Sequence, residues 1–155
     1  MRGHAYRFAG GTPSLWVWVK PDMLDPMDRS YKAITMEDTR YFHCDIKTIN
    51  LLPAVIYTQR AEEAGCDETI LHRGHRVTEC AHSNVHILKD GALKTAPCDN
   101  LILPGITRAH RIAQCREMGI PVIEEPFTVR EMMEAVVLYG GGRNAQIAGY
   151  RLLTQ

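Results

Sequence analysis

Several features that would indicate a membrane, secreted or nucleic-acid-binding protein are missing from this 155-residue sequence. No apolar run approaches the roughly 20 residues that a membrane-spanning helix requires. The N-terminal stretch MRGHAYRFAGG contains no continuous apolar signal core. Lysine plus arginine total 18, as do aspartate plus glutamate, so no charge excess recommends nucleic acid or an anionic membrane surface. These absences predict a soluble, cytoplasmic protein.

Cysteine is present, but without the spacing of a disulfide framework or a zinc site. The five cysteines are an odd number and include no C-x-x-C pair, which fits reduced, packed thiols. Histidines at positions 72, 75, 82 and 86 lie on different predicted strands and turns, with no HExxH or Cys/His pairing. The sequence therefore predicts no metal site.

Turn residues and apolar periodicity predict a mixture of strands and helices. Extended segments are expected at residues 14–21, 30–38, 68–73, 76–80, 84–91, 92–97 and 121–127. Helices are expected at residues 49–64, at 107–118 with Thr107 as its cap, after Thr128, and after a glycine-rich turn within 140–155. Asp90-Gly91 predicts a tight hairpin turn. This order indicates one domain of α/β or α+β class, with a small sheet covered by helices.

Lys47 stands in the otherwise apolar stretch YFHCDIKTINLL, residues 41–52, just after an acid and just before a predicted helix. A lysine at a strand end can pack its stem and keep its ammonium in water, which requires no function. The alternative is a reactive amine that a change of backbone direction projects into a cleft. The residues of this stretch alone leave both interpretations open.

Two further stretches carry groups that could act beside Lys47. RVTECAHSNV places Glu79 at a strand end, followed by small or polar residues through Ser83 and Asn84. An acid on a short strand is usually just solvated, so Glu79 alone is a weak signal. RGHAYRF supplies Arg7, whose planar guanidinium suits a carboxylate.

LPGITR places Gly105, Ile106 and Thr107 at the start of a predicted helix. The first N–H groups of a helix have no partner within it, and its dipole is positive there, so this position attracts phosphate. Thr107 is also a sufficient helix cap by itself, and the two roles are compatible.

Together these stretches resemble the class IV pyridoxal-phosphate aminotransferases, most of all those that act on D-amino acids such as D-alanine. CDIKTINLL, AEEAGCDETILHRG, VTE followed by SN, KDG and NLILPGITR stand in the family's order and spacing over about residues 29–130. The resemblance implies the C-terminal domain of fold type IV. It further implies that residues 1–28 are a remnant of the N-terminal domain and linker, and that 29–155 bind the cofactor.

The resemblance implies a role for each matching residue. Lys47 corresponds to the Schiff-base lysine, which joins the cofactor aldehyde and moves the substrate proton. That role calls for a lysine held partly out of water beside a cationic neighbour. Glu79 is expected to face the pyridine nitrogen and keep it protonated. Arg7 matches the arginine that binds the substrate carboxylate and, in the family's dimer, reaches the neighbouring site.

The cofactor phosphate and ring are expected among the remaining matched residues. Ile106 and Thr107 would offer N–H groups and a hydroxyl to the phosphate, and Leu103 would support the ring face. The other expected cofactor-binding residues are Gly105, His82, Ser83 and Asn84. His82 stands where relatives carry a small hydroxyl, and its ring could either hydrogen-bond the phosphate or obstruct it.

The implied function is ping-pong transfer of an amino group from a D-amino acid, with D-alanine expected, to 2-oxoglutarate through pyridoxal 5′-phosphate. A homodimer is expected, with no nucleic-acid or membrane partner. Branched-chain aminotransferase and aminodeoxychorismate lyase are alternatives with the same fold. A catalytically inactive domain is the alternative of another class, because the chain is expected to lack most of the family's N-terminal domain and a segment after Tyr139.

Overall fold

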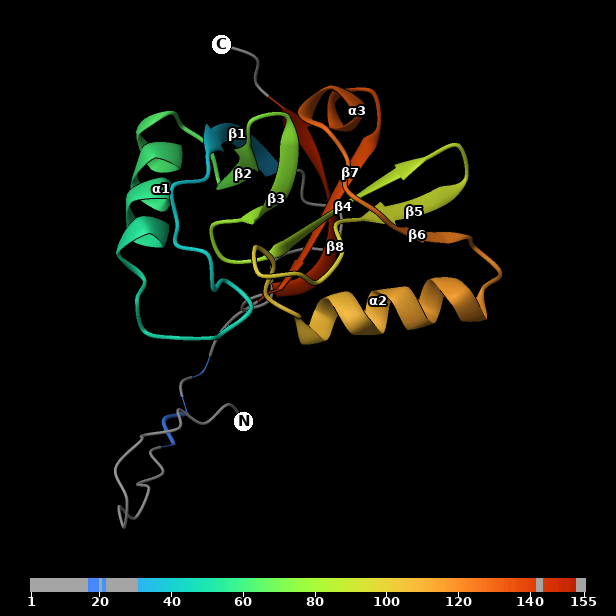
Figure 1. Ribbon diagram of the computed structural model, residues 1–155, viewed down its shortest axis with the longest axis horizontal. Coiled ribbons are helices and arrows are strands. Elements are labelled where there is room, and N and C mark those ends of the chain that lie inside the picture. The colour runs from blue at the N-terminus through green and yellow to red at the C-terminus, as the bar shows by residue number, and fades with distance from the viewer. Residues whose placement is uncertain (1–16, 20, 22–30, 142–143, 153–155) are drawn as a thin grey trace.

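The computed structural model describes residues 17–19, 21, 31–141 and 144–152. Its strands are β1 (Tyr31–Glu37), β2 (Glu68–Arg73), β3 (Arg76–Cys80), β4 (Asn84–Lys89), β5 (Ala92–Thr95), β6 (Val122–Glu124), β7 (Val136–Gly141) and β8 (Asn144–Leu152). Its helices are α1 (Leu52–Glu63), α2 (Ile106–Glu117) and α3 (Val129–Met133). Figure 1 shows these elements in one mixed sheet with helices around it, in the order β3-β2-β1-β8-β7-β4-β5-β6. The predicted mixed α and β class is confirmed.

Strand direction divides the sheet into two parts. β1 runs parallel to β2 and to β8, and α1 provides the crossover between β1 and β2. β4 pairs antiparallel with β5 and β7, and β6 extends this part parallel to β5. The connection from β1 into α1, residues 38–51, therefore leaves one end of the sheet, and Lys47 lies within it.

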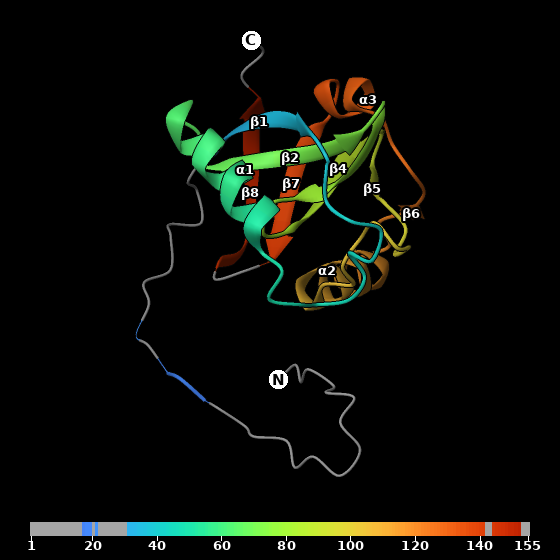
Figure 2. The same cartoon turned by 60° about the vertical axis from the view of Figure 1, so that its left-hand side comes forward.

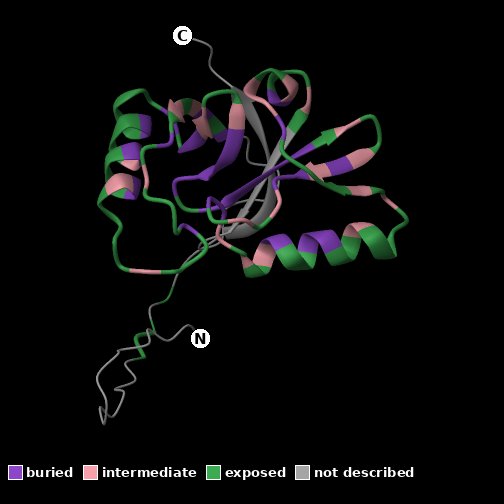
Figure 3. Ribbon diagram, in the orientation of Figure 1, coloured by how far each residue is buried: buried purple, intermediate pink, exposed green. Residues whose placement is uncertain are grey.

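Helices α1 and α2 contact different parts of the sheet (Figure 2). α1 packs on β1 and β2 through Ala54, Tyr57 and Ala61, whose helical spacing puts them on one face. α2 contacts β6 and β7, and the short α3 contacts β7. The buried side chains gather along β2, β3 and β4 between these helices (Figure 3). No helix in the described residues is long and apolar enough to span a membrane.

Most predicted elements from residue 30 to 127 are confirmed, with shifted ends. The Asp90-Gly91 turn joins β4 to β5, and both residues have positive φ (51° and 76°), as a type I′ hairpin turn requires. The predicted α2 begins one residue early, because Gly105 is its N-cap in an extended conformation. Thr107 is therefore not the cap.

Of the two C-terminal helices predicted, the one after the glycine-rich turn is wrong and the one after Thr128 is confirmed in a shorter form. Residues 144–152 form β8, paired antiparallel with β7, instead of a helix after the glycine-rich turn. The helix after Thr128 has the predicted cap, with a capping box to Glu131, but it ends at Met133 and β7 begins at Val136. Residues 17–19 have no regular structure, and the rest of the strand predicted at 14–21 lies almost wholly outside the described residues.

Candidate active site

A cavity of about 900 Å³ lies where the loop of residues 38–51, the β3–β4 connection and the start of α2 meet. Nine of the ten predicted site residues line it: Lys47, Glu79, His82, Ser83, Asn84, Leu103, Gly105, Ile106 and Thr107. These residues come from three separate stretches of the chain. The tenth, Arg7, lies outside the described residues, so its role stays a prediction.

Glu79, near the end of β3, is a buried acid with both carboxylate oxygens hydrogen-bonded. Its Oε1 accepts from Arg40 Nη1 at 2.5 Å. Its Oε2 accepts from Asn84 Nδ2 and from the backbone N–H of Leu103, each at 3.1 Å. Burial raises the pKa of the Glu79 carboxyl, and the charge of Arg40 opposes that shift. The carboxyl group is thus fixed in place beside a compensating cation.

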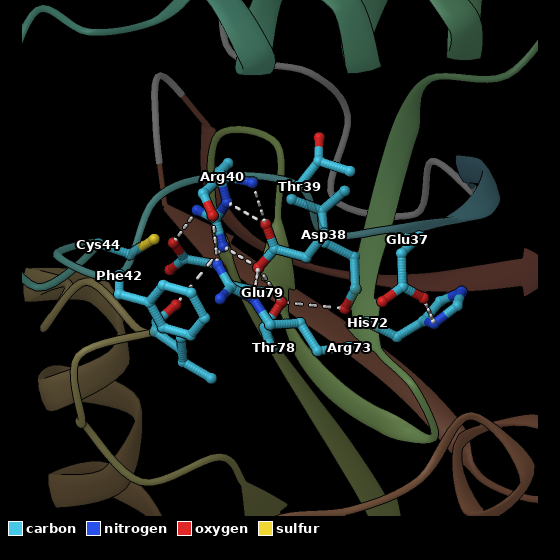
Figure 4. Close-up of polar contacts among 12 residues, drawn as sticks. Glu37, Asp38, Thr39, Arg40, Phe42, Cys44, His72, Arg73, Thr78 and Glu79 are labelled. Atoms are coloured by element: carbon cyan, nitrogen blue, oxygen red, sulfur yellow. Dashed lines mark hydrogen bonds and ion pairs between the residues drawn. The ribbon is translucent and has the colours of Figure 1, made fainter.

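Arg40 was not among the predicted site residues, although it lines the cavity. Its Nε and Nη2 bind the two oxygens of Asp38, both at 2.9 Å, while its Nη1 binds Glu79 (Figure 4). Burial disfavours its charge, but Asp38 and Glu79 outweigh that effect and raise the pKa of Arg40. The sequence signal for this pair is an acid and an arginine, Asp38 and Arg40, two residues apart just before the Lys47 stretch.

Asp38 completes this buried ion network. Its carboxylate also accepts from the Thr78 hydroxyl at 3.0 Å. Burial alone would raise its pKa, yet the hydrogen bonds and charge of Arg40 lower the pKa of Asp38. The guanidinium of Arg40 therefore links two buried carboxylates and supplies positive charge to both.

Lys47 lies in the loop between β1 and α1, as predicted, and lines the cavity. The expectation that it is partly out of water is wrong for this chain, because the residue is exposed. Ile46 and Leu51, which are close to Lys47 in the sequence, are themselves each 55% exposed, so their side chains do not bury the lysine.

His82 contacts helix α1. Its Nε2 lies 2.6 Å from Thr58 Oγ1, and that hydroxyl also lies 2.9 Å from Ala54 O. Whether Nε2 or Oγ1 donates in this pair depends on the tautomer of the ring. Desolvation and the charge of Lys47 lower the pKa of His82. The ring is thus hydrogen-bonded to α1 through Thr58.

The start of α2 has the predicted features of an anion site. No side chain caps it, and the first helical bond runs from Ala109 N–H to Gly105 O at 3.1 Å. The N–H groups of Ile106 and Thr107 therefore have no acceptor within the helix. A Cβ on Gly105 would lie 2.1 Å from Asn84 Oδ1, so a larger residue would displace Asn84.

Glu68, the first residue of β2, is a second buried acid at the cavity, and sequence reasoning missed it. It accepts from Thr69 N–H at 2.9 Å, and the Ser83 hydroxyl donates to it at 3.5 Å. Burial raises its pKa to about 7. An acid at a strand start carries no sequence signal of burial, because the β3–β4 connection that covers it is distant in sequence.

Comparisons with known proteins agree with this geometry. A family profile described as "Amino-transferase class IV" matches residues 6–146. The D-alanine aminotransferase of Listeria monocytogenes serotype 1/2a (strain 10403S) is 50% identical over 103 residues, 66% of this chain and 36% of that protein. The chain spans only 36% to 52% of the length of the D-alanine aminotransferases compared.

Two solved structures show the same fold. The Escherichia coli branched-chain amino acid aminotransferase has a TM-score of 0.66 at 27% identity, covering 79% of this chain and 43% of that one. A Legionella pneumophila structure named as a 4-amino-4-deoxychorismate lyase has a TM-score of 0.73 at 24% identity, covering 83% and 49%. The fold is thus that of the fold type IV aminotransferases.

Proposed function

The chain belongs to the class IV aminotransferase family, and on that premise we propose that it carries the lysine-bearing part of a D-amino-acid aminotransferase site. The proposed reaction moves the amino group of a D-amino acid, D-alanine first, to 2-oxoglutarate. The observation that carries the proposal is the convergence of the nine matched residues on one cavity. The substrate follows from the D-alanine aminotransferase relatives, which share 33% to 50% identity.

The residues around the cavity fit pyridoxal 5′-phosphate. Lys47 offers an amine to its aldehyde, Glu79 offers a buried acid to its ring nitrogen, and the α2 N-terminus offers N–H groups to its phosphate. When bound, the cofactor supplies the electron sink for the charge left at the substrate Cα. The cavity of about 900 Å³ falls within the common size range of cofactor sites.

Each protein group then has a defined task. Lys47 would accept the proton from the substrate Cα and deliver it to the cofactor carbon that carried the aldehyde. Glu79 would keep the pyridine nitrogen protonated, and the hydrogen bonds from Asn84 and Leu103 to its Oε2 would hold the carboxylate in position for this. Arg40 would keep the charge of Glu79 balanced. Arg7 would bind the substrate carboxylate, and a second copy of the chain is expected to complete the site.

Purified chain mixed with pyridoxal 5′-phosphate tests the proposal. An absorbance band that borohydride converts to a stable mass addition on Lys47, and that K47A lacks, is the expected result. Absence of the adduct from the wild-type chain would favour the inactive-domain alternative.

D-alanine alone separates the enzyme classes. A transaminase converts the pyridoxal form to the pyridoxamine form with this substrate and no keto acid, whereas a lyase does not. Conversion by L-valine but not by D-alanine would instead support branched-chain specificity.

A further inference from the structure

Arg73, the last residue of β2, reaches the loop that carries Lys47 (Figure 4). Its Nη2 donates to the carbonyl oxygens of Arg40 at 2.6 Å and Tyr41 at 3.2 Å. Its guanidinium carbon lies 4.4 Å from the centroid of the Phe42 ring. One side chain therefore holds three consecutive residues of the loop against the sheet.

Asn100 fixes the next part of the loop. Its side chain donates to Phe42 O at 3.1 Å, and its carbonyl accepts from Cys44 N–H at 2.8 Å. Between this point and α1 the loop makes contacts of its own, such as Ile46 N–H to His43 O at 3.1 Å. The place of Lys47 thus depends on how residues 40–44 are held.

A second connection runs from Arg73 to Glu79. Arg73 Nε lies 3.4 Å from Asp38 Oδ2. The Asp38 carboxylate accepts from Nε and Nη2 of Arg40, and the remaining nitrogen of Arg40, Nη1, donates to Glu79. Loss of Arg73 would remove one of the two cations that face the buried Asp38. The position of Arg40, and with it the hydrogen bond to Glu79, would then be less constrained.

We propose that Arg73 is a positioning residue: its guanidinium places Lys47 by fixing residues 40–42 and supports Glu79 through Asp38 and Arg40. This inference rests on the proposed function. The role requires arginine, because a planar guanidinium can bind two carbonyl groups, face a carboxylate and stack on Phe42 at once. A lysine ammonium keeps the charge but offers neither the fork nor the stacking plane.

The test separates placement of Lys47 from general binding by using two ligands. Pyridoxine 5′-phosphate has no aldehyde, so its affinity reports the phosphate and ring contacts alone. The rate at which pyridoxal 5′-phosphate forms a borohydride-trapped adduct on Lys47 reports the position of the amine. R73K should slow adduct formation by about tenfold or more, since misplacing a reacting group by ~1 Å can cost about 10²-fold in rate. Its affinity for pyridoxine 5′-phosphate should stay within about twofold, a change of less than 0.5 kcal/mol, because lysine keeps a cation facing Asp38 and so preserves the support of Glu79.

Two further variants keep the result interpretable. R60K, at an exposed ion pair on α1, is the matched control and should change neither quantity. F42A removes the stacking partner at a residue that is 64% exposed, so the fold should persist while adduct formation slows by a smaller factor.

An adduct rate in R73K equal to that of the wild type would overturn the inference, and so would equal losses in rate and affinity. If R73K does not fold, the unchanged rate of F42A would overturn it. A wild-type chain that binds pyridoxine 5′-phosphate but forms no adduct on Lys47 would overturn the proposed function, and this inference with it.

Discussion

Glu68 should cost the folded chain stability at neutral and alkaline pH. It is 8% exposed, and burial raises its pKa to about 7 from an ordinary value of 4.5. Hydrogen bonds from the backbone N–H groups of Thr69, Ala81 and His82 and from the Ser83 hydroxyl only partly offset the loss of water. The substitution E68Q keeps the shape and removes the ionisation. Its amide oxygen can still accept from backbone N–H groups, and its amide nitrogen can donate to the Ser83 hydroxyl oxygen.

The sign and size follow from linkage. A carboxyl group that binds its proton more tightly when folded contributes fully to stability below pH 4.5, and this contribution is lost as the pH rises to about 7. At 1.36 kcal/mol per pKa unit, a shift of about 2.5 units amounts to roughly 3 kcal/mol above pH 7. E68Q should therefore be about as stable as the wild type at pH 4.5 and up to ~3 kcal/mol more stable at pH 8.

Urea unfolding of both proteins at intervals from pH 4.5 to 8 measures this difference. The control is E62Q, an exposed acid on α1, whose profile should follow that of the wild type. A stability difference between E68Q and the wild type that stays constant with pH would refute the reasoning. So would a loss of stability in E68Q at pH 8, since it would mean that the folded state favours the ionised carboxylate.

Three further substitutions test other parts of the fold. R40M should destabilise the chain by about 3–5 kcal/mol in urea unfolding at pH 7.5, because two buried carboxylates lose their shared cation. The double variant R40M/E79Q should recover part of the lost stability, because one of the two uncompensated charges is then gone. His86 is fully buried with a pKa lowered to about 3, so wild-type stability should fall with pH below 6.5, and H86L should reduce that dependence. G105A should destabilise the chain by about 1–3 kcal/mol and weaken pyridoxine 5′-phosphate binding, because its Cβ meets Asn84 Oδ1; unchanged affinity would contradict this.

Local signals were sufficient for much of the fold. The alternation of apolar and polar residues in strands, the Asp90-Gly91 turn and the glycine before α2 are each determined by a few neighbouring residues. Such features can be recognised directly in the sequence. β8 could not be found this way. Its sequence, NAQIAGYRL, follows a glycine-rich turn and does not alternate regularly between apolar and polar residues. It becomes a strand through pairing with β7, which is nearby in the sequence, and with β1, which is distant.

The same distinction between local and long-range signals applies to the residues of the candidate site. Lys47, Glu79 and Thr107 carry motifs that can be recognised one stretch at a time. Arg73 and Glu68 contribute through burial and through contacts with residues far along the chain, and no short pattern encodes those. Residues proposed to contact ligands thus stand in recognisable short stretches, whereas the residues that hold them in place are recognisable only in the folded chain.

Lys47 is exposed, and so are the apolar residues near it in the sequence: Ile46, Ile49, Leu51, Leu52, Val55 and Ile56 are each between 48% and 84% exposed. Burial of these side chains therefore contributes little to holding this part of the loop. The contacts that hold it lie toward the sheet, where Arg73 donates to the carbonyl oxygens of Arg40 and Tyr41 and Asn100 donates to that of Phe42. The position of the Lys47 amine in this chain thus depends on polar contacts of residues 40–44 and not on apolar packing around the lysine.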